Sequence, residues 1–153
     1  MHVIVKLIGA VFLTAAATLV GVVISDRLKN RINALSWYLR STQIIADKIR
    51  FSAIEIRKIT EALPCYDNYI KICEPFKVKA QNPFLNEGDV SLINAFFAEL
   101  GMGDTTEQIN ICNMYAKELE ARYTLAQKEY SEKSKPIKSL GFFAGLGVAI
   151  VLL

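Results

Sequence analysis

The sequence has few of the residues that carry enzyme chemistry. Its single histidine, His2, stands beside the terminus with no partner for general acid–base catalysis. The glycines Gly101 and Gly103 lie too close together for a phosphate-binding loop, and no lysine follows them. No serine or cysteine has a neighbouring base that would activate it as a nucleophile. The sequence therefore predicts that the protein is not an enzyme and takes no cofactor.

The cysteines exclude two further classes of protein. There are three, Cys65, Cys73 and Cys112, with no C-x-x-C spacing and no histidine nearby. This pattern fits neither a disulfide framework nor a zinc site, so we expect no metal. We expect the cysteines to be small buried side chains in a reducing compartment.

The balance of charge excludes a nucleic-acid partner. All 15 acidic residues lie between positions 26 and 136, where 16 basic residues nearly balance them. No basic stripe with interleaved aromatic residues is present. We therefore expect function through contacts with proteins and lipid.

Each end of the sequence has a long apolar run. Residues 3–24 carry one charge, Lys6, and as a helix of about 33 Å would cross the ~30 Å hydrocarbon core. Residues 137–153 would form a helix of about 25 Å, with Lys138 reaching the head groups. We predict transmembrane helices at 3–24 and 137–153, enclosing a helical domain at 26–136. A signal peptide is the alternative for the first run, and a buried core helix for the second.

Basic residues gather beside both apolar runs, and the positive-inside rule then predicts a cytoplasmic middle with both termini on the opposite side. We expect these residues to meet anionic lipid head groups or a partner: Arg27, Lys29, Arg31, Lys133, Lys135 and Lys138. Small residues four apart, at Ala17 and Gly21 and at Gly141 and Gly145, suit close packing of helices in a membrane. Glycine is also simply common in membrane helices.

Two matched seams predict two long antiparallel helices in the middle region. In each, apolar residues alternate at spacings of three and four, which is the pattern of one stripe along a helix. The first seam is Leu28, Ile32, Leu35, Leu39, Thr42, Ala46 and Ile49, and the second is Ile109, Cys112, Ala116, Leu119, Tyr123, Ala126 and Tyr130.

Three shorter helices are predicted between the long ones, at about 52–63, 66–76 and 89–100, with a loop at 77–88. Ser52 with Glu55, and Asp104 with Glu107, have the spacing of capping boxes. Gly101 suits a helix end, and Pro136 predicts a kink or short break. The expected fold is an all-α antiparallel bundle of five to six helices, the sixth coming from the resemblance described next.

Three segments resemble a known family. The run FFAELGMGD at 96–104, with Gln108 after it, resembles the F-x-x-x-L-G-x-x-D…Q signature of the stage III sporulation protein AB family. Residues 137–146, IKSLGFFAGL, are similar to that family's I-K-S-L-G-F-L-A-G-L ending, and residues 6–12 to its K-L-x-G-A start.

The resemblance implies a membrane protein of endospore-forming bacteria, in the mother-cell membrane around the forespore. Its cytoplasmic domain would be similar to the six-helix platform domains of type II secretion and type IV pilus systems. The implied partners are other sporulation channel components and a cytoplasmic secretion-type ATPase of the stage III sporulation AA type, which the platform would couple to the channel.

The residues that could contact such a partner cluster at the turn before the second long helix: Glu99, Gly101, Asp104 and Gln108. Gly101 and Asp104 also have structural explanations, as a helix stop and a helix cap. A second hypothesis of a different class is an exported helical protein with an N-terminal signal peptide.

Overall fold

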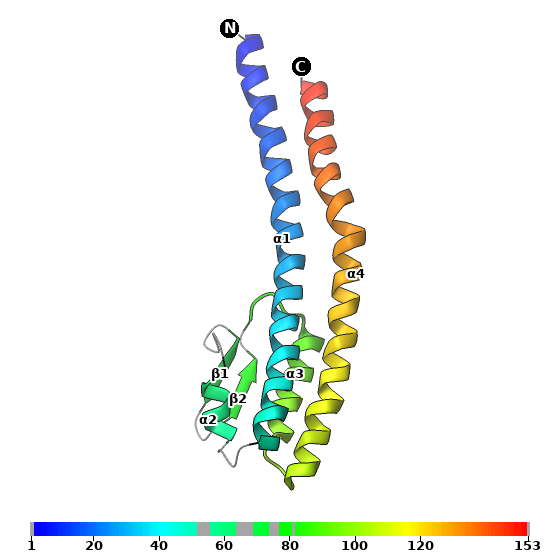
Figure 1. Cartoon of the computed structure of the whole chain (residues 1–153). Coiled ribbons are helices and arrows are strands. Elements are labelled where there is room, and N and C mark those ends of the chain that lie inside the picture. The colour runs from blue at the N-terminus through cyan, green and yellow to red at the C-terminus, as the bar shows by residue number, and fades with distance from the viewer. Residues whose placement is uncertain (1, 52–55, 64–68, 74–76, 81, 153) are drawn as a thin grey trace. The chain divides into compact units, whose positions relative to one another are not determined.

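The computed structural model describes residues 2–51, 56–63, 69–73, 77–80 and 82–152. These residues form four helices and a two-stranded sheet (Figure 1). The helices are α1 (His2–Phe51), α2 (Ile56–Glu61), α3 (Glu87–Glu99) and α4 (Thr105–Leu152), and the strands are β1 (Ile70–Cys73) and β2 (Lys77–Ala80). The predominantly helical class is confirmed, but the described part contains four helices rather than five or six.

The number of helices differs because strands take the place of the helix predicted at 66–76. Each apolar run, predicted as a separate span, continues into the long helix beside it. α1 extends unbroken from His2 to Phe51, and α4 passes through Pro136 without ending. Of the two outcomes predicted for Pro136, the short break does not occur, and the kink stays a prediction. A proline removes one backbone donor and crowds the carbonyl one turn before it, which can bend a helix without ending it.

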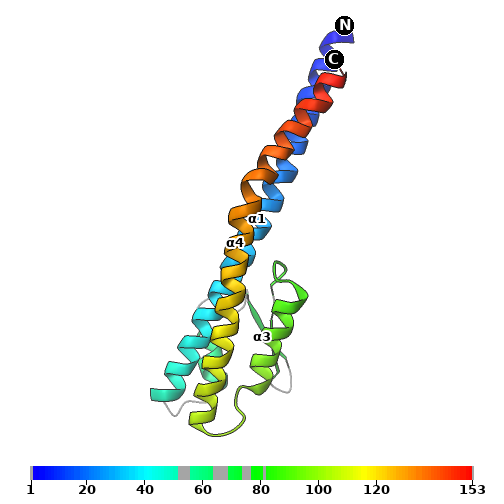
Figure 2. The same ribbon diagram turned by 90° about the vertical axis from the view of Figure 1, so that its right-hand side faces the viewer.

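The chain divides into two compact units, residues 31–125 and residues 1–30 with 126–153. In the first unit, the lower parts of α1 and α4 run antiparallel, side by side in both views (Figures 1 and 2). Their predicted seams are confirmed, since Leu35, Thr42 and Ala46 are buried on α1, and Cys112 and Leu119 on α4. The buried face of α1 is wider than one stripe and also includes Ala34, Tyr38, Ser41 and Ile45.

α3 packs its apolar face into the core of this unit. Ile93, Phe96 and Phe97 are buried, and the Phe96 ring lies 5.4 Å from that of Tyr115 on α4. On another side, the Asn94 carboxamide oxygen accepts a hydrogen bond of 2.8 Å from the backbone amide of Ala80 at the end of β2. α3 is thereby tied to both α4 and the sheet.

The predicted helix at 66–76 is wrong, because residues 70–73 and 77–80 form an antiparallel hairpin that pairs Ile70 with Ala80 and Cys73 with Lys77. Both segments alternate apolar and polar residues with the period of two that a strand requires. The helical spacing of Tyr69, Ile70 and Cys73 competed with this alternation, and pairing with a second strand favoured the sheet. The predicted loop at 77–88 therefore begins only after β2.

α1 ends at Phe51 and α2 begins at Ile56, so the predicted end of the long helix near Ser52 agrees with the structure. The capping box at 52–55 lies outside the described residues. On α2 and just beyond it, Ile59 and Leu63 are buried as predicted. On α1, the Trp37 indole stacks on the Tyr69 ring at 4.4 Å, and the Tyr38 hydroxyl donates a hydrogen bond to the Tyr69 carbonyl.

The second unit consists of two helical segments, one from each end of the chain, lying side by side (Figures 1 and 2). The residues that are buried in the described part of this unit are small: Gly21, Ser25, Ala126 and Ser134. Among the residues whose side chains are described, no helical stretch has both the length and the apolar content that a membrane crossing needs. Many side chains of 3–24 and 137–153 lie outside that part, and the two spans stay predictions.

We predict that the Cys112 thiol is unreactive in the folded protein. Burial raises its pKa from 9.0 to about 11, so the folded chain keeps a proton that the unfolded chain releases. Stability should therefore decrease as pH rises from about 9 to 11. With Cys65→Ser and Cys73→Ser in place, iodoacetamide at pH 8.5 should label Cys112 only after denaturant is added. Equal labelling with and without denaturant would contradict the buried position. A variant that also carries Cys112→Ala measures the background labelling of other groups.

Candidate functional site: the Asp89 ion cluster and the turn at residues 100–104

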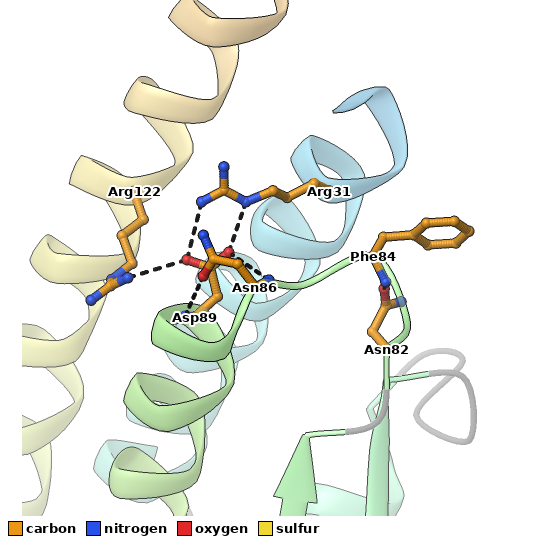
Figure 3. A network of polar contacts seen from close by, with 6 residues as sticks. All are labelled: Arg31, Asn82, Phe84, Asn86, Asp89 and Arg122. Atoms are coloured by element: carbon orange, nitrogen blue, oxygen red, sulfur yellow. Dashed lines mark hydrogen bonds and ion pairs between the residues drawn. The ribbon is translucent and has the colours of Figure 1, made fainter. Parts of the chain in front are cut away.

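The strongest polar feature of the structure is a buried carboxylate bound by two arginines (Figure 3). Asp89, on α3, has 0% of its side chain exposed. Its Oδ2 accepts from Arg31 Nε at 2.8 Å, and its Oδ1 accepts from a second nitrogen of Arg31 at 3.3 Å and from Arg122 at 3.2 Å. Arg31 comes from α1 and Arg122 from α4, so one carboxylate joins three helices.

Local sequence places Asp89 where it can do this. Asn86 is the N-cap of α3, and its side-chain oxygen accepts from the Asp89 amide at 2.7 Å. The Asp89 carboxylate accepts in return from the Asn86 amide at 3.4 Å, which completes a capping box. The first turn of a helix also favours a negative charge, so the helix end and the ion cluster support each other.

Charge and burial set the role of the cluster. A buried carboxylate is costly unless its oxygens are paired, and here both are occupied by charged donors. The two guanidinium groups are only partly buried, with 17% and 34% of the side chains exposed. Gly88 gives Arg122 its room, because a Cβ there would lie 3.0 Å from a guanidinium nitrogen. The cluster is suited to holding helices in register, and its groups do not form a catalytic set.

The predicted partner-contact residues do come together, around the turn between α3 and α4. Gly101 has φ 96° and Gly103 has φ 84°, in the region where glycine is favoured. Asp104 Oδ1 accepts from the Glu107 amide at 2.7 Å, which confirms Asp104 as the helix cap.

Two further residues of the turn make internal contacts. Glu99 accepts a hydrogen bond of 2.7 Å from the Tyr115 hydroxyl, and burial together with this contact raises the pKa of Tyr115 to about 12. Gln108 Nε2 donates to the Gly103 carbonyl at 3.3 Å, while its Oε1 is buried with no hydrogen-bond partner among the described residues. Asp104 itself is exposed.

The other predicted residues have different outcomes. Arg31 was expected to meet lipid head groups or a partner, and that expectation is wrong because its guanidinium binds buried Asp89 within the same domain. Arg27 and Lys29 are exposed, and Lys133 forms a 2.7 Å ion pair with Glu129 one turn away. The side chains of Lys135 and Lys138, and the surroundings of Gly141 and Gly145, lie outside the described part of α4.

The sequence reasoning missed Asp89 and Arg122. Asp89 stands at N3 after Asn86, which is the spacing of a capping box, and that signal could have placed it at the first turn. Arg122 follows the buried Leu119 by three residues on α4, so it lies beside the buried face of the helix. A cation is unusual at such a position unless an acid faces it. No group of three or more metal-ligating side chains occurs among the described residues.

We predict that Asp89→Asn destabilises the fold. The amide keeps the size of the side chain but leaves Arg31 and Arg122 without a counter-charge, at a cost of about 2–4 kcal/mol in the free energy of unfolding. Denaturant unfolding of the full chain in detergent, followed by circular dichroism, measures this. Asp47→Asn on the exposed face of α1 should change stability by less than about 0.5 kcal/mol. If Asp89→Asn lowered the free energy of unfolding by as little as Asp47→Asn, the cluster would not be stabilising.

We predict that Gly103→Ala costs about 1–2 kcal/mol, because φ is positive and the new Cβ would lie 2.0 Å from Glu107 Oε2. Adding Glu107→Ala should reduce this cost without removing it, since the backbone strain remains. Gly9→Ala is the control, because nothing lies within 4 Å of its Cβ position. The same unfolding assay applies, and no difference between Gly103→Ala and Gly9→Ala would contradict the strain.

Comparison with known proteins identifies the family. The model of the stage III sporulation protein AB family matches residues 72–153, which is more than half of the chain and includes α3, the turn and α4. No curated protein and no solved structure matches the chain significantly. The resemblance of residues 96–108 and 137–146 is thus confirmed, and the chain belongs to the stage III sporulation protein AB family.

Proposed function

We propose that this protein is a membrane-anchored platform of a sporulation secretion-type channel, which couples a cytoplasmic ATPase to the channel during endospore formation. The family match is the observation that carries the proposal, since it assigns the chain to a stage III sporulation protein. The absence of any catalytic arrangement in the sequence agrees with a role through contact.

The burial pattern of the unit formed by residues 1–30 and 126–153 supports an anchor in lipid. Among the side chains described there, the small residues Gly21 and Ser25 are buried, while large apolar side chains are exposed. Phe12 is 79% exposed, and the others on this surface are Val11, Leu19, Val20, Val23 and Ile24. In water this surface would be unfavourable, whereas helices in lipid pack through small residues and turn large apolar ones outward.

The charges next to this apolar surface support a cytoplasmic domain. Arg27 and Lys29 follow the first apolar run and are exposed, as topology-determining residues would be. The mother-cell membrane around the forespore is the location that the family implies, with the domain on the cytoplasmic side and the termini on the other.

The turn at residues 100–104 supports a contact site for the ATPase of the stage III sporulation AA type. Asp104 and Glu107 are exposed there, and Met102 is exposed over 65% of its surface. An exposed apolar side chain in the same turn as exposed carboxylates suits a partner surface that has a small pocket and basic residues. Gly101 and Gln108 contribute by shaping the turn.

Fractionation of sporulating cells tests the anchor. We expect the intact N-terminus in the membrane fraction, resistant to extraction by high salt and carbonate, with the middle of the chain cleaved by protease only from the cytoplasmic side. Soluble protein shortened after about Ala17 would instead support the exported alternative. Replacing Leu19 and Val20 by aspartate should release the protein from the membrane, and a chain that stays bound would contradict lipid contact by this surface.

A pull-down tests the partner. The full chain in detergent should retain the purified secretion-type ATPase, and Asp104→Lys should abolish retention while circular dichroism shows a folded protein. Asp104→Asn is the matched control, because it keeps a capping acceptor and loses only the charge. Gln108→Ala should weaken binding less. If every variant retained the ATPase equally, Asp104 and Gln108 would have only a structural role. If the wild type did not retain the ATPase, the proposed coupling would be wrong.

A further inference from the structure

A pocket lies between α3 and α4 within the unit of residues 31–125, away from the turn. Its volume is about 390 Å³, and its walls include Leu92 and Ala95 from α3 and Met114, Glu118 and Arg122 from α4. Figure 2 shows these two helices beside each other. The pocket opens on an outer face of the unit, because Met114 is 52% exposed and Ser91 and Glu118 are exposed.

The apolar character continues along α4 beyond the pocket. Met114, Glu118, Ala121 and Leu125 follow spacings of four, three and four, which puts them on one stripe of the helix. Leu125 is 65% exposed. Met114 lines the pocket together with Leu92 and Ala95 of α3, and Leu125 extends the exposed stripe of α4 beyond the pocket. Such a groove with an apolar stripe is the type that accepts an amphipathic helix.

The charges in the groove favour a basic occupant. Arg122 is already bound to Asp89, whereas Glu118 forms no ion pair or hydrogen bond with any described residue. The carboxylate of Glu118 lies in the middle of the stripe, between Met114 and Leu125. A positively charged side chain approaching this point would meet an exposed acid, because Arg122, the cation that also lines the pocket, is bound to Asp89.

We propose that the α3–α4 groove is a docking site for an amphipathic helix of a partner protein, which presents an apolar stripe interrupted by one lysine or arginine opposite Glu118. α3 has 13 residues and is therefore about 20 Å long, which matches an occupant of three to four turns. This contact is separate from the turn proposed for the ATPase.

A second copy of the chain fits the groove poorly. Parallel pairing of two α4 helices would bring Glu118 against Glu118, and like charges in register are unfavourable. Antiparallel pairing would direct the two helices in opposite directions, whereas two copies anchored in one membrane run the same way. This last step depends on the proposed function, but the charge argument does not.

Two labelled helical peptides of 14 residues test the groove on the full chain in nanodiscs. Both have leucines at the stripe positions, and one has a central lysine where the other has glutamate. We expect the lysine peptide to bind about fivefold more tightly, and Glu118→Lys to reverse the preference. Glu120→Lys is the matched control, since Glu120 is exposed on a different face of α4 and should leave the preference unchanged.

The peptide measurements have outcomes that would overturn the proposal. Equal affinity of the two peptides for the wild type, or a preference that survives in Glu118→Lys, would exclude recognition by this acid. Met114→Asp should abolish binding of both peptides while circular dichroism shows an intact fold, and undiminished binding would exclude the groove. A wild-type dimer that becomes monomeric in Met114→Asp would make a second copy the occupant and overturn the assignment to a partner. The ATPase pull-down is independent of these results.

Discussion

The fold of the domain depends on one buried carboxylate. Asp89 accepts from Arg31 on α1 and Arg122 on α4 while it completes the cap of its own helix, so the relative positions of three helices are fixed at one point. The two long helices alone would form an apolar seam that tolerates sliding by a turn. An ion cluster does not, because any shift leaves a charge buried without a partner. We infer that the cluster fixes the register of a domain built mainly from two helices, in addition to the stability that would be lost with its carboxylate.

The two units differ in the kinds of side chain that they bury. In residues 31–125 the large apolar side chains are buried around Leu35, Ile93 and Leu119, as expected of a domain in water. Among the described side chains of residues 1–30 and 126–153, the buried ones are small and several large apolar ones are exposed. The hydrophobic effect gives the first pattern and close packing in lipid gives the second, so the change supports our proposal of an anchored protein.

Membership of the stage III sporulation protein AB family gives these features a common purpose. On our proposal, the protein acts through the surfaces that it presents to partners. Two are available in the domain, the acidic turn with exposed Met102 and the apolar groove around Met114 and Glu118. On our proposal, their separation allows the protein to bind the ATPase at the turn and a helix of a further component in the groove.

The sequence by itself determined the helical class, both long seams, the caps at Asp104 and Gly101, and the family. All of these depend on local spacing or local backbone geometry. It did not determine the hairpin at 70–80, since strand pairing requires a partner segment. In addition, period-two alternation over only four residues is compatible with a predicted helix. The sequence also did not determine the role of Arg31. Arg31 and Asp89 are 58 residues apart, and only tertiary packing decides whether a charge on a helix faces water or an acid from another helix.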